Sequence, residues 1–144
     1  MDPPEELKSV YPIAGRDFTN AGRISTAIMD ILKRLGADPE VVRRVAIASY
    51  EAEMNVVMYA LRGTISLRVS PQAVTIEVKD EGPGIEDIDL AMQEGYSTAT
   101  PEMQEMGFGA GMGLPNIKKI ADEFEITSEV SKGTQLYIRV NQIA

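Results

Sequence analysis

The chain has 144 residues, the size of one ordinary domain, and we expect any protein on which it acts to be a separate molecule. Hydrophobic residues make up 44% of the chain and charged residues 25%, which is typical of a globular domain with a real core. The net charge of −8 argues against a broad electrostatic hold on nucleic acid or on an anionic membrane. Only a local basic spot would attract phosphate.

Two missing residue types exclude whole classes of chemistry. Without cysteine there is no disulfide, thiol nucleophile or cysteine-bound metal, and without histidine there is no Ser-His-Asp triad, histidine-bound zinc or phosphorylated histidine. Proton chemistry must therefore use carboxylates, Lys or Tyr. The acidic N-terminus is unlike a signal peptide, and the longest apolar stretch, residues 56–61, is far too short to span a membrane. We expect a cytoplasmic protein.

An edge strand and an amphipathic helix are the first elements expected along the chain. Residues 1–9 are interpreted as a flexible lead-in, and residues 10–13 as a strand that ends at Gly15. Apolar residues recur every three or four positions over residues 20–35, which predicts a helix. Gly36 supplies its stop signal.

A second helix is predicted to begin at Asp38-Pro39 and to run to about residue 60, because Asp caps helices and Pro suits the first helical position. Glu51 and Asn55 stand one turn apart at the border of its apolar stripe, so their side chains should project together from the seam between core and solvent. Glu53 is assigned to another face as a surface charge. The stripe itself consists of Val41, Val45, Ala48, Ala52, Val56 and Tyr59.

Two alternating strands follow, at residues 65–69 and 74–78. Asp80 continues the inward parity of the second strand, where a carboxylate must find a hydrogen-bond donor. The next four residues, Glu81-Gly82-Pro83-Gly84, form a rigid turn whose glycines allow close approach of the backbone.

The second half of the chain contains a short helix, a long loop, a helix and a hairpin. The short helix is expected at residues 86–94, and residues 95–113 are interpreted as a lid, a binding loop or a disordered segment. A helix then starts at Leu114-Pro115 and ends near residue 122. The hairpin pairs residues 124–130 with residues 134–140, and Thr134 shares the inward parity of its strand.

This order of elements predicts an α+β fold, a two-layer sandwich with a mixed, mostly antiparallel sheet and helices on one face. We expect residues 10–144 to form a single domain. In such a sandwich Asp80, the glycine-rich segment and Thr134 converge between the layers.

Alternate glycines are the strongest local signal in the sequence. Such a stretch can present successive backbone N–H groups to an anion, and the helix that follows adds its positive end. The alternative is a flexible hinge or a tight packing turn. The spacing does not match a dinucleotide fingerprint, and the Gly-Lys-Ser/Thr of a Walker A loop is absent. The glycines are Gly107, Gly109, Gly111 and Gly113.

Carboxylates provide the other candidate sites, each with a simpler alternative. Asp80 can accept a hydrogen bond from an exocyclic amine while Gly82 and Gly84 admit a flat ring; otherwise the segment is a turn with a local Asx hydrogen bond. Glu51 and Asn55 can supply a base and an oxygen ligand for Mg²⁺; otherwise they lie on a solvated helix edge. Lys118 and Lys119 are interpreted as ordinary exposed lysines.

The order of four motifs is more specific than any one of them. In this order the motifs resemble the N, G1 and G2 boxes and the closing Gly-Thr of the GHKL ATPase superfamily, over about residues 10–140. The resemblance implies a Bergerat-type fold with a glycine-rich ATP lid. The motifs are Glu51-x-x-x-Asn55, Asp80-x-Gly82-x-Gly84, Gly107-x-Gly109-x-Gly111-x-Gly113 and Gly133-Thr134.

Within this superfamily the chain is most similar to the small switch kinases and anti-sigma factors of bacterial partner-switching systems. Gly95-Tyr96-Ser97-Thr98, and Gly109-Ala110-Gly111 followed by Leu114-Pro115, resemble the RsbT-type switch kinases. Thr100-Pro101-Glu102 is closer to the SpoIIAB and RsbW anti-sigma kinases. Tyr59 stands where many anti-sigma members carry His, which favours the switch-kinase side.

The resemblance also implies a role for each motif residue. Asn55 would coordinate Mg²⁺, Glu51 would be the general base, and Asp80 would bind the adenine amino group. Gly82 and Gly84 would lie near the adenine, and Thr134 would support its site. The ATP lid would supply the remaining nucleotide contacts, namely Ser97, Thr98, Gly107, Gly109, Gly111 and Gly113.

The function implied is that of a Mg-ATP-dependent protein serine/threonine kinase that phosphorylates a STAS-domain antagonist. An anti-sigma factor that sequesters a sigma subunit is the nearest alternative, and a non-catalytic nucleotide-sensing module is the third. A sigma factor or a downstream phosphatase are further candidate partners, and a homodimer is left open. We expect no nucleic-acid or membrane partner.

Overall fold

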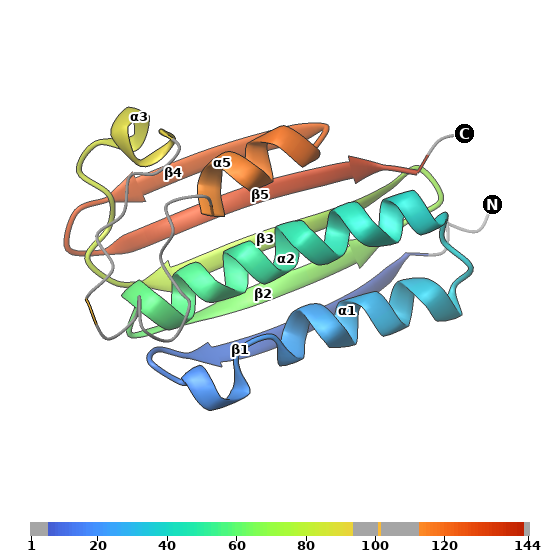
Figure 1. Cartoon of the computed structure of the whole chain (residues 1–144), viewed down its shortest axis with the longest axis horizontal. Coiled ribbons are helices and arrows are strands. Elements are labelled where there is room, and N and C mark those ends of the chain that lie inside the picture. The colour runs from blue at the N-terminus through green and yellow to red at the C-terminus, as the bar shows by residue number, and fades with distance from the viewer. Residues whose placement is uncertain (1–5, 94–100, 102–112, 143–144) are drawn as a thin grey trace.

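Five strands form one antiparallel sheet in the computed structural model, which describes residues 6–93, 101 and 113–142 (Figure 1). The strand order is β1-β2-β3-β5-β4, and each of the four neighbouring pairs is antiparallel, so the expectation of a mixed sheet was wrong for the described strands. The strands are β1 (Leu7–Ala14), β2 (Arg62–Val69), β3 (Ala73–Glu81), β4 (Glu123–Glu129) and β5 (Gly133–Asn141).

Three helices cover one face of this sheet, so the predicted α+β two-layer sandwich is confirmed (Figure 1). They are α1 (Arg23–Arg34), α2 (Pro39–Tyr59) and α5 (Gly113–Ile120). Two short helices, η1 (Phe18–Asn20) and α3 (Ile88–Ala91), lie in the connections. In the described ranges no helix combines the length and the apolar character needed to cross a bilayer.

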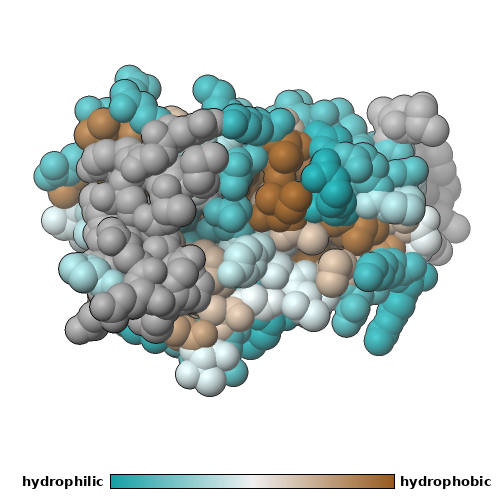
Figure 2. Space-filling view, in the orientation of Figure 1, coloured by the Kyte–Doolittle hydropathy of each residue, from teal (hydrophilic) through white to brown (hydrophobic). Residues whose placement is uncertain are grey.

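The core lies between the helical layer and the sheet, as the two periodicities predict. Inward side chains of β2 and β3 are buried at every second position, and the apolar stripe of α2 is buried along its length except at the half-buried Tyr59. From α5, Ile117 is fully buried. Figure 2 shows hydrophilic residues over much of the helical face, with hydrophobic residues emerging between the helices. The buried strand residues are Ile65, Leu67, Val69, Val74, Ile76 and Val78.

Local sequence signals predict where some of the helices and strands begin, but not where others do. Asp38 caps α2 as predicted, since its Oδ1 accepts a hydrogen bond from the Glu40 backbone N–H at 2.9 Å. β1 begins at Leu7, before the predicted start, because residues in the expected lead-in pair with β2. α1 begins at Arg23, after the predicted start, because the preceding residues form the separate turn η1.

The assignment of Glu53 to the surface was wrong. Glu53 is 1% exposed. Its carboxylate accepts hydrogen bonds from the backbone N–H groups of Gly22 and Ser25, at 3.0 Å each, and of Ile24, at 3.4 Å. The first amides of a helix have no partner within the helix, and Gly22, at the N-cap of α1, has no side chain to accept from them. Glu53 of α2 therefore caps α1 from a neighbouring helix.

Candidate functional site

The first turn of α5 meets the middle of α2 at two polar side chains. Glu51 and Asn55 are both half-buried on the side of α2 that faces Gly113, the first residue of α5. A Cβ atom added at Gly113 would lie 3.2 Å from Glu51 Oε2 and 3.4 Å from Asn55 Oδ1. The one-turn spacing thus brings these side chains to one place, and a residue without a side chain lets α5 start against them.

Two opposing effects act on the protonation of Glu51. Burial raises the pKa of this carboxyl, and a hydrogen bond with the Asn116 side chain partly opposes that rise. Asn116 lies three residues after Gly113 in α5. Asn116 was not among the predicted site residues, although its place just after Leu114-Pro115 puts it on the first turn of a predicted helix.

Asp80 lies at the end of β3, as its inward parity predicts, and meets the start of β5. Its Oδ1 accepts a hydrogen bond from the Thr134 backbone N–H at 3.1 Å. Burial raises the pKa of Asp80, and the Thr134 N–H partly opposes that effect. The Asp80 side chain is half-buried. Asp80 and Thr134 therefore converge, as the sequence analysis expected.

A hydroxyl network supports this corner of the sheet. Ser128 of β4 faces Thr134 across the β4–β5 ladder, and their hydroxyl oxygens lie 2.9 Å apart. Ser128 Oγ also accepts a hydrogen bond from the Ile85 backbone N–H at 2.8 Å and donates to the Gly133 carbonyl at 3.1 Å. Ser128 was another residue that the sequence analysis missed, although its strand parity matches that of Thr134.

Close backbone approach explains two glycines around Asp80. Gly84 has a φ of +73°, and a Cβ there would overlap the Glu129 carbonyl oxygen. A Cβ on Gly133 would overlap the Asp80 carbonyl oxygen. Gly82 is tied to the same turn, because its N–H donates to the Lys132 carbonyl at 3.1 Å. The loop after β3 and the β4–β5 turn can pack together only because these side chains are absent.

Several predicted contacts lie outside the described residues. These are the lid residues Ser97, Thr98, Gly107, Gly109 and Gly111. Gly113 is the one member of the glycine-rich motif within the described ranges.

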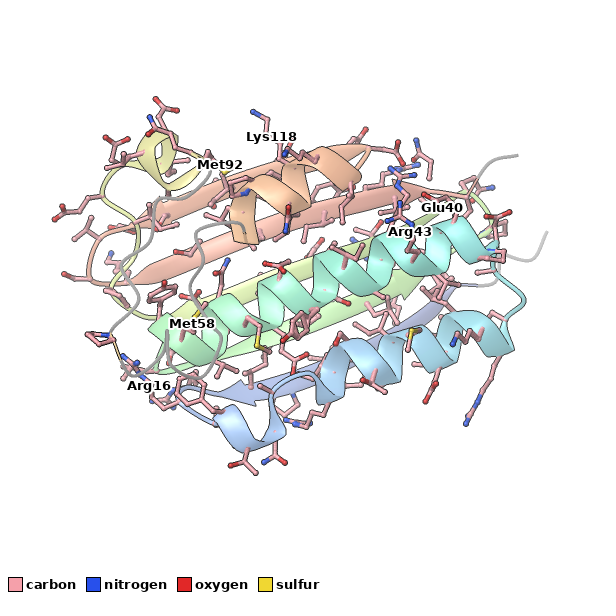
Figure 3. The ribbon with its side chains drawn as sticks, in the orientation of Figure 1. Arg16, Glu40, Arg43, Met58, Met92 and Lys118 are labelled. Atoms are coloured by element: carbon pink, nitrogen blue, oxygen red, sulfur yellow. The ribbon has the colours of Figure 1, made fainter. Side chains whose placement is uncertain are left out.

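A cavity of about 340 Å³ opens at the C-terminal end of α2. Of the predicted nucleotide-binding residues, Gly82 lines it, while Asp80 does not. Arg16 lies beside this end of the helix (Figure 3), where its backbone N–H donates to the Val57 carbonyl at 2.7 Å. The full lining consists of Gly15, Arg16, Tyr59, Ala60, Leu61, Gly82 and Pro83.

The oxygen donors at this site fit a cation shared with a ligand better than a metal held by protein side chains alone. Within residues 6–93, 101 and 113–142, no group of three or more His, Cys, Asp or Glu side chains forms a metal site. Asn55 Oδ1 and the Glu51 carboxylate are oxygen donors, which suits Mg²⁺ because it usually keeps several waters and takes further ligands from phosphates. Lys118 is exposed and points away from α2, as expected for an ordinary surface lysine (Figure 3).

Comparisons with known proteins agree with the order of the motifs. A family model described as a histidine kinase-like ATPase domain matches residues 16–140. The chain is 32% identical over 111 residues to the serine/threonine-protein kinase RsbT of Bacillus subtilis (strain 168), which covers 74% of this chain and 77% of that relative.

Anti-sigma factors are similar to the same degree. The chain is 35% identical over 114 residues to the anti-sigma F factor of Thermoanaerobacter sp. (strain X514), covering 79% of this chain and 72% of the relative. The anti-sigma F factor of Caldanaerobacter subterraneus subsp. tengcongensis is 33% identical over 114 residues, with the same coverage of 79% and 72%. The resemblance to GHKL switch kinases and anti-sigma factors is confirmed, and the chain belongs to the histidine kinase-like ATPase family.

Proposed function

We propose that this chain is a Mg-ATP-dependent protein serine/threonine kinase that phosphorylates a STAS-domain antagonist in a bacterial partner-switching pathway. The observation that carries this proposal is the meeting of Glu51 and Asn55 with Gly113 at the start of α5. A carboxylate can serve as a base, an amide oxygen can bind Mg²⁺, and the N-terminal turn of a helix favours an anion such as a phosphate. The similarity to a serine/threonine-protein kinase over most of the chain supports the same activity.

In the proposed complex, ATP lies between α2, α5 and the end of β3. Asp80 accepts a hydrogen bond from the adenine amino group, next to Gly82 and Gly84, while Thr134 supports that carboxylate through its N–H. The segment from Ser97 to Gly113 is the proposed lid over the phosphates. We assign residues 10–144 to one ATP-binding kinase domain.

The proposed reaction transfers the γ-phosphoryl group to a hydroxyl of the partner. The hydroxyl oxygen bonds to the γ-phosphorus, the bond from that phosphorus to the β–γ bridging oxygen breaks with its electron pair on ADP, and Glu51 takes the hydroxyl proton. Asn55 would hold Mg²⁺ together with phosphate oxygens, and the bound ion would supply positive charge that offsets the charge on the transferring group.

Transfer of label from Mg-ATP to STAS-domain proteins tests this proposal. Glu51→Gln keeps the shape of the side chain but removes the base, so the transfer rate should fall by about 10²- to 10⁴-fold while ATP still binds. Glu125→Gln, at an exposed position on β4, is the matched control and should transfer label at the wild-type rate. Equal rates for the wild type and Glu51→Gln would refute the assignment of the base.

An anti-sigma factor is the second candidate function, favoured by the similarity to two anti-sigma F factors. It predicts that the chain captures a sigma subunit and that ATP or ADP strengthens the complex. Binding of ATP with neither transfer nor sigma capture would instead indicate a nucleotide-sensing module.

A further inference from the structure

Ser128 joins three segments at the corner where the end of β3 meets the start of β5. It is half-buried on β4, and it shares a sheet face with Thr134, the residue opposite it in the ladder. Its hydroxyl oxygen lies 2.8 Å from the Ile85 backbone nitrogen, 3.1 Å from the Gly133 carbonyl oxygen and 2.9 Å from Thr134 Oγ1. One hydroxyl therefore contacts both the loop after β3 and the first two residues of β5.

The partners of Ser128 determine where its hydrogen goes. A serine hydroxyl has one hydrogen to donate and two lone pairs that accept. The Ile85 N–H can only donate and the Gly133 carbonyl can only accept, so the hydrogen of Ser128 is used on that carbonyl. All three contacts are then satisfied only if the Thr134 hydroxyl donates to Ser128. Thr134 Oγ1 consequently keeps lone pairs, and no hydrogen, for a ligand.

We propose that Ser128 is a positioning residue that makes the Thr134 hydroxyl a hydrogen-bond acceptor, so that this corner selects a purine with an amino group over one with a carbonyl in its place. This inference rests on the proposed binding of ATP beside Asp80 and adds to it the residue that sets the direction of the hydrogen bonds there. Ser128 would not itself touch the nucleotide.

Two neighbouring acceptors give the proposed preference its physical basis. Asp80, as an ionised carboxylate, accepts hydrogen bonds only, and its Oδ1 already accepts the Thr134 backbone N–H at 3.1 Å. The amino group of adenine brings two N–H donors to such acceptors. A carbonyl oxygen would meet further lone pairs instead, and half-buried acceptors left without a donor are costly. A site built from hydrogen-bonding groups therefore rejects the analogue that lacks the donor.

Binding of Mg-ATP and Mg-ITP, measured by calorimetry, tests this inference, because inosine triphosphate has a carbonyl in place of the amino group. The wild type should bind Mg-ATP at least about 10²-fold more tightly. In Ser128→Ala the Thr134 hydroxyl is free to rotate and to donate to a carbonyl, so the ratio of the two Kd values should fall by about 10-fold. An unchanged ratio, even with weaker binding of both nucleotides, would overturn the proposal, since Ser128 would then only support the fold.

Three further variants separate positioning from a general loss of structure. Thr127→Ala removes a hydroxyl from the exposed neighbouring position on β4 and should keep the wild-type ratio. Ser128→Thr keeps the hydroxyl and should restore most of the ratio lost in Ser128→Ala. Thr134→Val removes the acceptor itself and should lower the ratio to a similar extent. An unchanged ratio in Thr134→Val would overturn the proposal whether or not Ser128→Ala folds.

A double-mutant cycle shows whether Ser128 acts through Thr134. On the Thr134→Val background, Ser128→Ala should change the Kd ratio little further. Additive changes in the ratio would overturn the proposal. Thermal unfolding without nucleotide checks that each variant keeps its fold.

The binding readout does not depend on phosphoryl transfer. A wild type that selects Mg-ATP but transfers no label would refute the kinase function and leave this inference standing. An active kinase in which Ser128→Ala and Thr134→Val keep the wild-type Kd ratio would refute this inference alone. Equal binding of the two nucleotides by the wild type would overturn both this inference and the proposed role of Asp80.

Discussion

Two glutamates that are two positions apart on α2 occupy opposite seams of the helical layer. Glu53 faces α1, is almost completely buried, and accepts hydrogen bonds from backbone amides of α1. Glu51 faces the start of α5 and is half-buried, and burial raises the pKa of its carboxyl. The backbone partners of Glu53 are fixed parts of the fold, whereas Glu51 is only half-buried. The α1 seam therefore provides stability, and the α5 seam carries the proposed chemistry.

The largest expected effect on stability is at the α1 seam. Glu53→Ala leaves the first amides of α1 without acceptors in a buried place, and this should lower the free energy of unfolding by about 3 kcal/mol. Urea denaturation measures the loss. Glu53→Gln keeps one acceptor oxygen and should lose less. A loss below about 1 kcal/mol in Glu53→Ala would contradict the capping role.

A smaller effect is expected at the far end of the α5 seam. Asp122 Oδ2 accepts a hydrogen bond from the Asn141 backbone N–H at 2.7 Å and pairs with Arg44 at 3.2 Å, while Arg44 Nε donates to the Ile120 carbonyl at 2.7 Å. Because this cluster is partly exposed, Asp122→Asn should cost only about 0.5–1 kcal/mol.

The loss in free energy of unfolding caused by Asp122→Asn should also depend on pH. The Asn141 N–H and Arg44 lower the pKa of Asp122 in the folded chain. The carboxylate therefore contributes its stability above the unfolded pKa of about 3.9, and the contribution disappears as the pH falls through the lower folded value. Unfolding measurements on the wild type and Asp122→Asn should accordingly converge in acid. A difference that grows in acid would contradict this sign.

Gly113→Ala tests whether the start of α5 affects chemistry more than stability. The added Cβ would crowd Glu51 Oε2, which destabilises the folded chain, whereas alanine favours the helix over glycine by about 1 kcal/mol. Because the two effects oppose each other, the free energy of unfolding should change by less than about 0.5 kcal/mol. The transfer rate should nevertheless fall severalfold because the base is displaced. If Gly113→Ala transfers label at the wild-type rate, the residue at the start of α5 does not influence the proposed base.

The smallest effect on stability is expected from Glu51→Gln. Burial raises the pKa of Glu51 in the folded chain, so the contribution of this carboxyl to stability is greatest below its unfolded pKa and is lost as the pH rises through the folded value. The free energy of unfolding of Glu51→Gln, relative to that of the wild type, should therefore increase slightly as the pH rises. A gain that shrinks with rising pH would contradict the burial of this group.

Much of the fold could be predicted from local periodicity. The two layers were predicted from the alternating pattern of β2 and β3 and from the three- and four-residue spacing of apolar residues in α2. The inward parity of Asp80 and Thr134 predicted that they lie close together, and a hydrogen bond joins them. The capping partner of α1 could not be predicted, because Glu53 lies about 30 residues from the amides it binds. Asn116 was not predicted for the same reason, since its effect on the pKa of Glu51 depends on how α5 packs across α2.

We propose that Asp80 recognises the adenine of a bound ATP, and the proposed kinase function depends on this contact. Asp80→Asn keeps an acceptor for the Thr134 N–H but turns an N–H donor toward the adenine amino group, so it tests recognition with little change to the fold. The most direct measurement is the unfolding free energy of the wild type and of this variant with and without Mg-ATP. At about 100 times its Kd, the nucleotide should stabilise the wild type by roughly 2.7 kcal/mol and the variant by much less. No stabilisation of the wild type, or equal stabilisation of both, would contradict the claim.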